Sequence, residues 1–141
     1  MSVFTPEEIE YLTKQHLGRL ATVNAKGNPQ NTPVGFRYNT DLDAIDIGGR
    51  DLIHTQKYRN ILKNPNVAFV VDDVLPPWRP RGVEIRGTVQ VVPTGGKEEF
   101  NDYFGDAMIR ITPTQIIGWG VYGENHPRLN RKMHQDSHEP S

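Results

Sequence analysis

The residues best suited to chemistry lie close together in the stretch from Ala44 to Asp73. A short apolar run, Ala44 to Ile47, leads into a polar segment that contains Gly48, Gly49, Arg50, His54, Thr55, Lys57 and Arg59. Paired glycines let backbone N–H groups approach a ligand closely, because they carry no Cβ. Thr55 and Lys57 fall at the predicted start of a short helix, where free N–H groups and the helix dipole favour an anion. The pattern is that of a phosphate-binding cradle, and the alternative is an ordinary strand–turn–helix unit with a solvated basic face.

The composition restricts what kind of protein this is. At 141 residues the chain is expected to form one domain, and 35% hydrophobic residues give it a modest core that favours an oligomer. A net charge of −1 gives no bulk attraction to nucleic acid or to an anionic membrane, so we expect neither partner and any basic site must be local. The chain has no cysteine, which excludes disulfides, thiolate chemistry and zinc held by cysteine.

The sequence carries no signal for export or for membrane insertion. Its first residues, MSVFTPEEIEYL, are acidic and lack the apolar core of a signal peptide, and no run is long enough to cross a membrane. We therefore expect a cytoplasmic protein. No cluster of His, Asp and Glu has the spacing of metal ligands, and no nucleophile–His–acid set is present, so we expect no metal site and no catalytic triad.

Local signals outline the secondary structure. A first helix is predicted to start with Thr5 as its N-cap and Pro6 as its first residue, and Glu8 closes a capping box with Thr5. Gly18 is expected to stop that helix. Further helices are predicted over residues 57–63 and 97–104. Strands are predicted over residues 19–23, 30–38 (broken at Pro33 and Gly35), 44–47, 67–71, 82–92, 108–112 and 115–119, with a proline-rich loop over 72–80.

These elements predict the fold class and the domain boundaries. Six or seven short strands with hairpin turns and a few small helices indicate a mainly β protein, an antiparallel barrel with helical caps. The domain is expected to cover residues 1–122. Residues 123–141 show no apolar periodicity, and we expect a disordered C-terminal tail there.

With its elements in this order, the chain resembles the flavin and deazaflavin oxidoreductases of the split β-barrel superfamily, whose founding member is pyridoxamine 5′-phosphate oxidase. The resemblance covers residues 3–120 and rests on six ordered blocks: LGRLATV, NTPVGFRY, IDIGGR, KYRNILKNPNVAFVVDD, WRPRGVEIRG and IRITPTQIIGWG. It implies an FMN-binding type of split β-barrel, Greek-key-like and antiparallel, that forms a homodimer with cofactor sites at the subunit interface.

Within that superfamily the chain is most similar to the actinobacterial group that uses coenzyme F-420, a deazaflavin with a phosphate and an oligoglutamate tail. The VVDD-to-WRPRGVEIRG passage and the WG ending resemble the subgroup with the reductases of tetracycline-type polyketides. The resemblance implies hydride transfer from reduced F-420 to an electron-poor double bond of a small organic substrate. The alternatives are an FMN-dependent oxidoreductase of the same fold, and a flavin, deazaflavin or haem-type binding protein without turnover.

The resemblance also assigns residues to the phosphate end of the cofactor. Lys57 matches the lysine that contacts phosphate in the family, and Thr55 is expected to add a hydroxyl donor beside it. Arg50 and Arg59 have two readings. Each either reaches the phosphate or glutamate tail of the cofactor, or pairs with a carboxylate from the set Asp46, Asp51 and Asp72.

Other residues are assigned to the ring and to the substrate. The expected ring wall consists of Thr32, Pro33, Val34, Gly35, Ile47 and Gly48, together with Arg81 and Gly82 at the start of a strand. Pro33 is alternatively a plain bulge at a barrel corner. Trp119 is expected at the subunit interface, reaching toward the partner's site, and Trp78 at the substrate mouth. No catalytic side chain is implied, because the cofactor carries the hydride.

Overall fold

A computed structural model describes residues 2–123 and 127–133 of the chain. The elements follow one another as α1 (Pro6–Lys14), β1 (Leu17–Val23), β2 (Pro29–Asn39), β3 (Ala44–Ile47), the 3₁₀ turn η1 (Leu52–His54), α2 (Gln56–Lys63), β4 (Asn66–Leu75), β5 (Arg79–Val92), α3 (Gly96–Glu99), β6 (Met108–Trp119) and β7 (Arg128–Lys132). In these ranges no helix has the length and apolar character that a membrane crossing requires.

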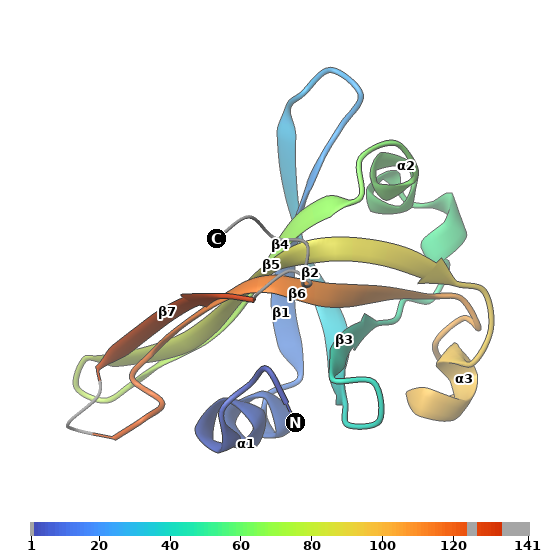
Figure 1. Ribbon diagram of the computed structural model, residues 1–141. Coiled ribbons are helices and arrows are strands. Elements are labelled where there is room, and N and C mark those ends of the chain that lie inside the picture. The colour runs from blue at the N-terminus through green and yellow to red at the C-terminus, as the bar shows by residue number, and fades with distance from the viewer. Residues whose placement is uncertain (1, 124–126, 134–141) are drawn as a thin grey trace.

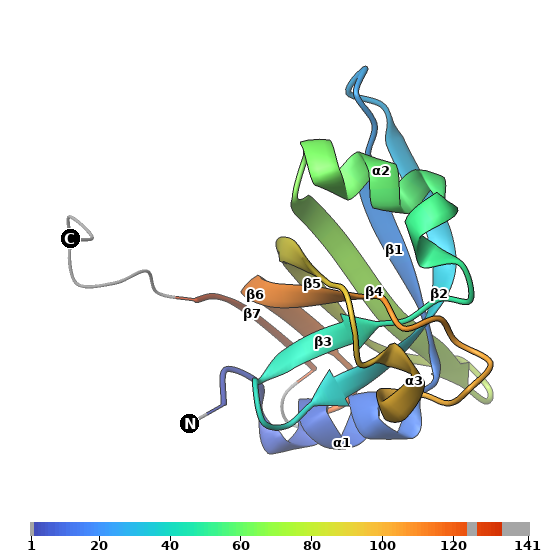
Figure 2. The same cartoon turned by 90° about the vertical axis from the view of Figure 1, so that its right-hand side faces the viewer.

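The strands form one antiparallel sheet that closes on itself. Their order is β3-β2-β1-β4-β5-β6-β7, and an additional pairing of β3 with β6 closes the six strands β1–β6 into a barrel. Figures 1 and 2 show α1 and α2 at opposite ends of the barrel, with α3 beside β3. β7 lies outside the closed barrel, against the free edge of β6. The predicted mainly β fold, a barrel with small helical caps, is confirmed.

The barrel interior is a continuous apolar core. Its fully buried side chains include Leu20, Ile45, Ile47, Phe69, Val71, Val83, Ile85, Ile109, Ile111 and Ile116. The ring of Phe69 also contacts Phe36 edge to face, with centroids 5.2 Å apart. Removing this apolar area from water is the main driving force for the fold, at about 25 cal/mol per Å².

The first helix starts where the capping signals place it but ends earlier than predicted. Thr5 caps the helix, and the Glu8 carboxylate accepts from the Thr5 N–H at 2.8 Å. The helix ends at Lys14, so the expectation that Gly18 stops it is wrong. Gly18 lies inside β1, where a Cβ would come within 2.5 Å of the Phe69 ring. The glycine is required by the core, since the aromatic ring occupies the space of its missing side chain.

Two predicted interruptions are absent from the strands that the structure describes. β2 is continuous through Pro33 and Gly35, and Pro33 pairs in register with Arg19. β2 pairs with β3 only from Phe36 onward, so one edge is free at Pro33 and a missing N–H is tolerated there. The two predicted strands over 108–119 are a single strand, β6, with a register shift opposite Arg86 and Gly87.

Two predicted connections are also wrong in length. The expected loop over 72–80 is a tight hairpin, because β4 continues to Leu75 and β5 begins at Arg79, with ladder pairs such as Val74 with Pro80. The predicted helix over 97–104 is a single turn, α3, that ends at Glu99. Cross-strand pairing in the first case, and contacts with the barrel in the second, override the local pattern.

The tail prediction is wrong for residues 128–132, which form β7, and the rest of that prediction falls partly on residues 124–126 and 134–141, outside the described ranges. Arg131 of β7 donates to the Glu8 carboxylate, with Nη1 2.9 Å from Oε2, and to the Val3 carbonyl. The Tyr122 hydroxyl donates to the same carboxylate. Glu8 is fully buried, so its charge depends on a residue near the far end of the chain.

Arg131→Ala is expected to lower the free energy of unfolding by roughly 3–5 kcal/mol, because it leaves the buried Glu8 carboxylate without its cation. Urea denaturation followed by circular dichroism measures this loss. The matched control is Lys132→Ala, an exposed neighbour on β7, which is expected to change stability by less than about 0.5 kcal/mol. Equal denaturation midpoints for the two variants would show that β7 contributes nothing through Glu8.

Candidate functional site

The predicted phosphate cradle begins at the start of α2. Thr55 is the N-cap residue, and its Oγ1 accepts from the Tyr58 N–H at 3.3 Å. The same hydroxyl donates to the Leu52 carbonyl at 2.6 Å. Its proton is therefore directed at the 3₁₀ turn before the helix. Thr55 shapes the cradle, but in this arrangement it does not offer a free hydroxyl donor beside Lys57.

Lys57 is a half-buried cation in the first turn of α2. No hydrogen bond or ion pair joins its ammonium group to another residue within the described ranges. Burial lowers the pKa of Lys57 below its ordinary value. A lysine that is partly desolvated and has no acidic partner is expected where an anionic ligand supplies the opposite charge.

A buried polar anchor fixes α2 on the barrel. Asn60 is 2% exposed, and its Nδ2 donates to the Thr22 hydroxyl at 2.9 Å and to the Gln30 side chain at 2.8 Å. Figure 2 shows α2 lying across β1 and β2, the strands that carry these acceptors. Asn60 was not among the predicted residues, although a polar residue beside Ile61 on the inner face of a short helix was a usable signal. The anchor sets where Lys57 lies relative to β2.

Of the two readings for Arg50 and Arg59, the pairing with nearby carboxylates is wrong. The three carboxylates have other partners: Asp46 binds Arg110, Asp51 binds His54 and Asp72 binds Arg19. The Arg50 guanidinium lies 5.2 Å from the centre of the Tyr103 ring, and Arg59 donates to Gln56 at 2.9 Å. Both arginines are exposed. The other reading, in which they reach the phosphate or glutamate tail of the cofactor, stays a prediction.

The predicted ring wall is covered by aromatic side chains. A Cβ at Gly48 would lie 2.8 Å from the Phe104 ring and 3.0 Å from the Phe100 ring, and one at Gly35 would lie 3.4 Å from Phe104. Phe100 and Phe104 stack with centroids 4.8 Å apart, and Tyr103 meets Phe104 edge to face. We call Phe100, Tyr103 and Phe104 the aromatic cover. The sequence analysis placed these residues in a helix and did not connect them with the wall.

The other wall residues differ in what they expose. The side chains of Val34 and Ile47 are buried in the barrel core, at 5% and 0% exposure, so neither side chain is offered to a ligand. Thr32 is half-buried and Pro33 is exposed. Along β2 the side chains of Thr32 and Val34 lie on one face of the sheet and Pro33 lies on the other. The assignment of this strand to the ring stays a prediction.

The second group of predicted residues lies at the other end of β4. Arg81 forms a two-pronged ion pair with Asp73, at 2.8 and 3.0 Å, and its guanidinium lies 5.0 Å from the Tyr11 ring centre. A Cβ at Gly82 would lie 2.6 Å from the Trp119 ring, so the indole packs directly on this glycine. Trp78, at the β4–β5 hairpin, is 74% exposed.

One chain does not bring the two groups together. α2 leads into Asn66 at the start of β4, whereas Arg81 pairs with Asp73 near its end. Seven residues of extended strand separate these points, which is about 23 Å. The start of α2, with Lys57, therefore lies apart from Arg81, Gly82, Trp78 and Trp119, whereas Gly35 of the ring wall pairs with Leu17 toward the Asp72 end of β1 and β4.

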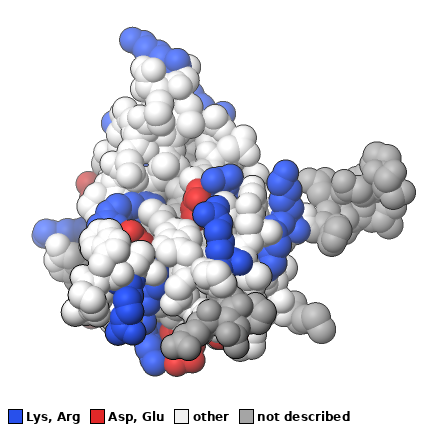
Figure 3. Space-filling model, turned by 90° about the vertical axis from the view of Figure 1, so that its left-hand side faces the viewer, with Lys and Arg blue, Asp and Glu red and all other residues white. Residues whose placement is uncertain are grey.

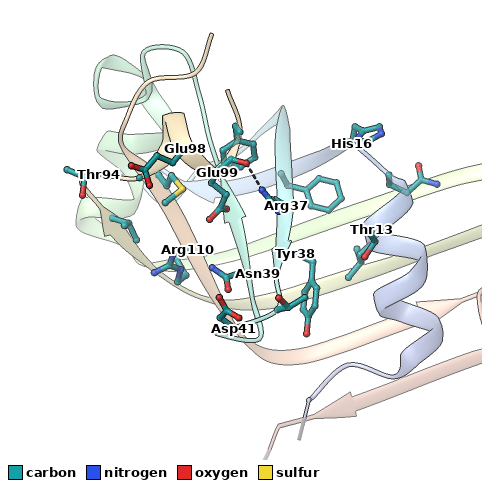
Figure 4. Close-up of a pocket in the computed structure, with 18 residues that line it drawn as sticks. Thr13, His16, Arg37, Tyr38, Asn39, Asp41, Thr94, Glu98, Glu99 and Arg110 are labelled. Carbon is teal, nitrogen blue, oxygen red and sulfur yellow. Dashed lines mark hydrogen bonds between the residues drawn. The ribbon is translucent and has the colours of Figure 1, made fainter. Parts of the chain in front are cut away.

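A sizeable cavity was not predicted from the sequence. It has a volume of about 800 Å³ and lies between the end of α1, the second half of β2, α3 and the start of β6. Figure 4 shows Arg37, Glu98, Glu99 and Arg110 among the side chains around it. Within the described ranges no three His, Asp or Glu side chains gather as a metal site would need.

The charge on the surface is uneven. On the face in Figure 3 the Lys and Arg side chains cover more area than Asp and Glu, so the local charge differs from the net charge of −1.

Comparison with known proteins agrees with this architecture. Residues 4–120 match the family model of pyridoxamine 5′-phosphate oxidase. The chain is 49% identical over 123 residues to a 5a,11a-dehydrotetracycline/5a,11a-dehydrooxytetracycline reductase of Streptomyces rimosus, and the match covers 86% of each chain.

Solved structures share the fold. An F420 reductase superposes with a TM-score of 0.60 at 28% identity, over 79% of this chain and 98% of the other. The FAD binding protein from Mycobacterium smegmatis superposes with a TM-score of 0.64 at 19% identity, over 93% and 100% of the two chains. At that identity the second likeness concerns the fold alone.

The ammonium group of Lys57 is expected to titrate at a lower pH in the folded protein than in the urea-denatured chain, because burial disfavours its charge. NMR of ¹³C-methylated lysines measures this, with Lys57→Ala assigning the signal. Inorganic phosphate is expected to move the folded-state pKa back upward, since an anion stabilises the charged form. A signal that ignores phosphate at every concentration would argue against an anion site at Lys57.

Proposed function

We propose, because this chain belongs to the pyridoxamine 5′-phosphate oxidase family, that it is an F-420-dependent reductase. In this proposal hydride passes from the reduced deazaflavin to an electron-poor double bond of a tetracycline-type precursor. The observation that carries the proposal is the 49% identity, over 86% of both chains, to a reductase of 5a,11a-dehydrotetracyclines. The likeness to an F420 reductase supports the choice of cofactor.

The residues at the predicted cradle fit a phosphate-bearing cofactor. Lys57 is half-buried with a pKa lowered by burial, and Arg50 and Arg59 lie exposed along the same segment. Bound F-420 supplies the hydride, so the chain itself has to bind, orient and exclude water. Lys57 would hold the phosphate as a point charge, and the strand from Thr32 to Gly35 would line the ring.

FMN is the second candidate cofactor. It carries a phosphate that the same lysine fits, and the fold is shared with flavin-binding proteins. What separates the two cofactors is the rest of the molecule, since F-420 extends beyond its phosphate into an acidic tail. The exposed guanidinium groups of Arg50 and Arg59 match such a tail, which favours F-420.

We further propose that two chains form a homodimer with sites at the subunit interface. The support is the separation of the two groups of site residues, which a second copy related by a two-fold axis can bring together. Trp119 of one protomer then completes the site that contains Lys57 of its partner. An interface of this kind buries on the order of 2,000 Å². Light scattering at micromolar concentration is expected to give twice the chain mass, and a monomer at that concentration would contradict the proposal.

The function is tested by binding and turnover with defined cofactors. The purified protein is expected to bind F-420 more tightly than FMN, and to reduce 5a,11a-dehydrotetracycline when reduced F-420 is supplied, as followed by cofactor absorbance and product mass. Turnover with reduced FMN and not with reduced F-420 would establish the second candidate. Cofactor binding without any hydride transfer to this substrate class would leave a binding protein.

Lys57→Ala tests the cradle within the same assays. Losing a charge-assisted hydrogen bond costs about 1.5–3 kcal/mol, or roughly ten- to a hundredfold in the dissociation constant of F-420. The matched control is Lys63→Ala, which removes an exposed lysine from the last turn of the same helix. A deazaflavin analogue without the phosphate is expected to bind the wild type and the Lys57 variant equally. Equal binding of intact F-420 by both would place the cradle elsewhere.

A further inference from the structure

The aromatic cover is held to the barrel through the single turn that precedes it. Arg37 of β2 donates to the backbone carbonyl of Glu99 at 2.6 Å, and the N–H of Gly105 donates to the Gly49 carbonyl at 2.8 Å. These two bonds bracket the cover between β2 and the end of β3. A further attachment is the Glu99 side chain, which lies at the edge of the 800 Å³ cavity (Figure 4).

The Glu99 side chain faces a carboxylate that already accepts three hydrogen bonds and keeps one acceptor position for a further donor. Asp46 of β3 is fully buried and accepts from Arg110 of β6 at 2.7 and 3.0 Å, and from Asn39 of β2 at 2.9 Å. Burial alone would raise the pKa of Asp46, but hydrogen bonds from its neighbours outweigh burial and lower it. Asp46 is therefore ionised, and Arg110 forms its two-pronged ion pair, through Nε and Nη2, with Asp46.

An ionised Glu99 is left with a buried oxygen that nothing satisfies. Its Oε2 is the one buried side-chain atom in the described ranges for which no hydrogen-bond donor is found. A carboxylate can only accept, so the neighbouring Asp46 cannot help it. A protonated Glu99 instead donates to Asp46, which satisfies both groups. Like-charge repulsion and burial act in the same direction, because both favour the neutral acid.

We propose that Glu99 and Asp46 share one proton, and that this proton fastens the aromatic cover over Gly35 and Gly48. Loss of the proton sets two adjacent negative charges against each other and releases the turn that carries Phe100. The cavity beside Glu99 gives the proton a route to water. Glu99 is thus a positioning residue, which acts on the wall through the cover.

Burial and the charges around Glu99 bring its pKa into the physiological range. Asp46 faces it from β3, Arg110 from β6 and Arg37 from β2, while Glu98 belongs to its own turn. Burial first, and then the hydrogen bond and charge of Asp46, raise the pKa of Glu99 to about 7, while the two arginines lower it. The folded state holds the proton between pH 4.5 and 7, where an unfolded chain releases it. Stability contributed by this proton is therefore lost as the pH rises through that window.

We call the shared proton of Glu99 and Asp46 the latch. Hydrogen exchange of the apo protein tests it without any cofactor. The amides of residues 96–105 in the wild type are compared with those of Glu99→Gln at the same pH. At pH 6 the two proteins are expected to exchange equally. At pH 8, one unit above the Glu99 midpoint, the wild type is expected to exchange about tenfold faster. The glutamine keeps a donor toward Asp46 at every pH. Glu99→Ala is expected to exchange fast at both values. Glu98→Gln, the matched control on the same turn, is expected to follow the wild type throughout.

A second measurement needs no variant. The ¹³C carboxyl signal of Glu99 in the wild type is expected to titrate near pH 7, together with the exchange rates of residues 96–105. A midpoint near that of a free glutamate, or exchange that is the same in wild type and Glu99→Gln at pH 8, would overturn the proposal.

The consequence for ligand binding rests on the proposed function and is measured separately. Wild-type affinity for F-420 is expected to change between pH 6 and 8 in a way that Glu99→Gln abolishes. If the exchange data support the latch but F-420 does not bind at all, the function fails and the latch stands. If F-420 binds with the same pH dependence in both proteins, the cover has no influence on the site.

Discussion

Closure of the barrel depends on a buried pair of charges between its shortest strand and its last barrel strand. β3 has four residues, all buried, and it completes the barrel by pairing with β6. Asp46 and Arg110 are direct partners in that register, and their side chains also form a two-pronged ion pair. A ladder of three residue pairs is short for such a task. The ion pair adds a fixed geometry to it, and the same carboxylate also faces the turn that leads to the aromatic cover.

The polar interior of this protein is organised as a few shared carboxylates. Glu8 caps its own helix and also receives Arg131 and Tyr122, so one buried acid ties α1 to β7. Asp73 receives both Arg81 and the Tyr11 hydroxyl, which joins α1 to the β4–β5 hairpin. Buried charges are tolerated only when their hydrogen bonds are satisfied. Each of these carboxylates satisfies that condition by connecting elements that are distant in the sequence.

Features of this fold that depend on neighbouring residues could be predicted from the sequence, and features that depend on distant contacts could not. The capping box fixed the start of α1, and the boundaries of α2 were within one residue, because both signals are local. The split-barrel fold and the family followed from the order of six motif blocks. β7 was missed because its decisive contact, Arg131 with Glu8, spans 123 positions. The hairpin at Pro76 was mistaken for a long loop, since pairing across β4 and β5 outweighs the local preference of proline. The position of Lys57 was predictable, whereas its lack of an acidic partner and the cover over Gly48 required the structure.

The number of charges beside the cover explains why a proton is used there. Two arginines approach the cluster, but Arg37 is engaged with a backbone carbonyl and Arg110 with Asp46. Within the described ranges no salt bridge joins Glu99 to a cation, so a neutral acid is the state in which its buried oxygen has a partner. A third arginine would have fixed the turn permanently. With a shared proton, the aromatic cover is attached at low pH and is released as the pH rises. The wall below it, at Gly35 and Gly48, can then be uncovered without unfolding the barrel.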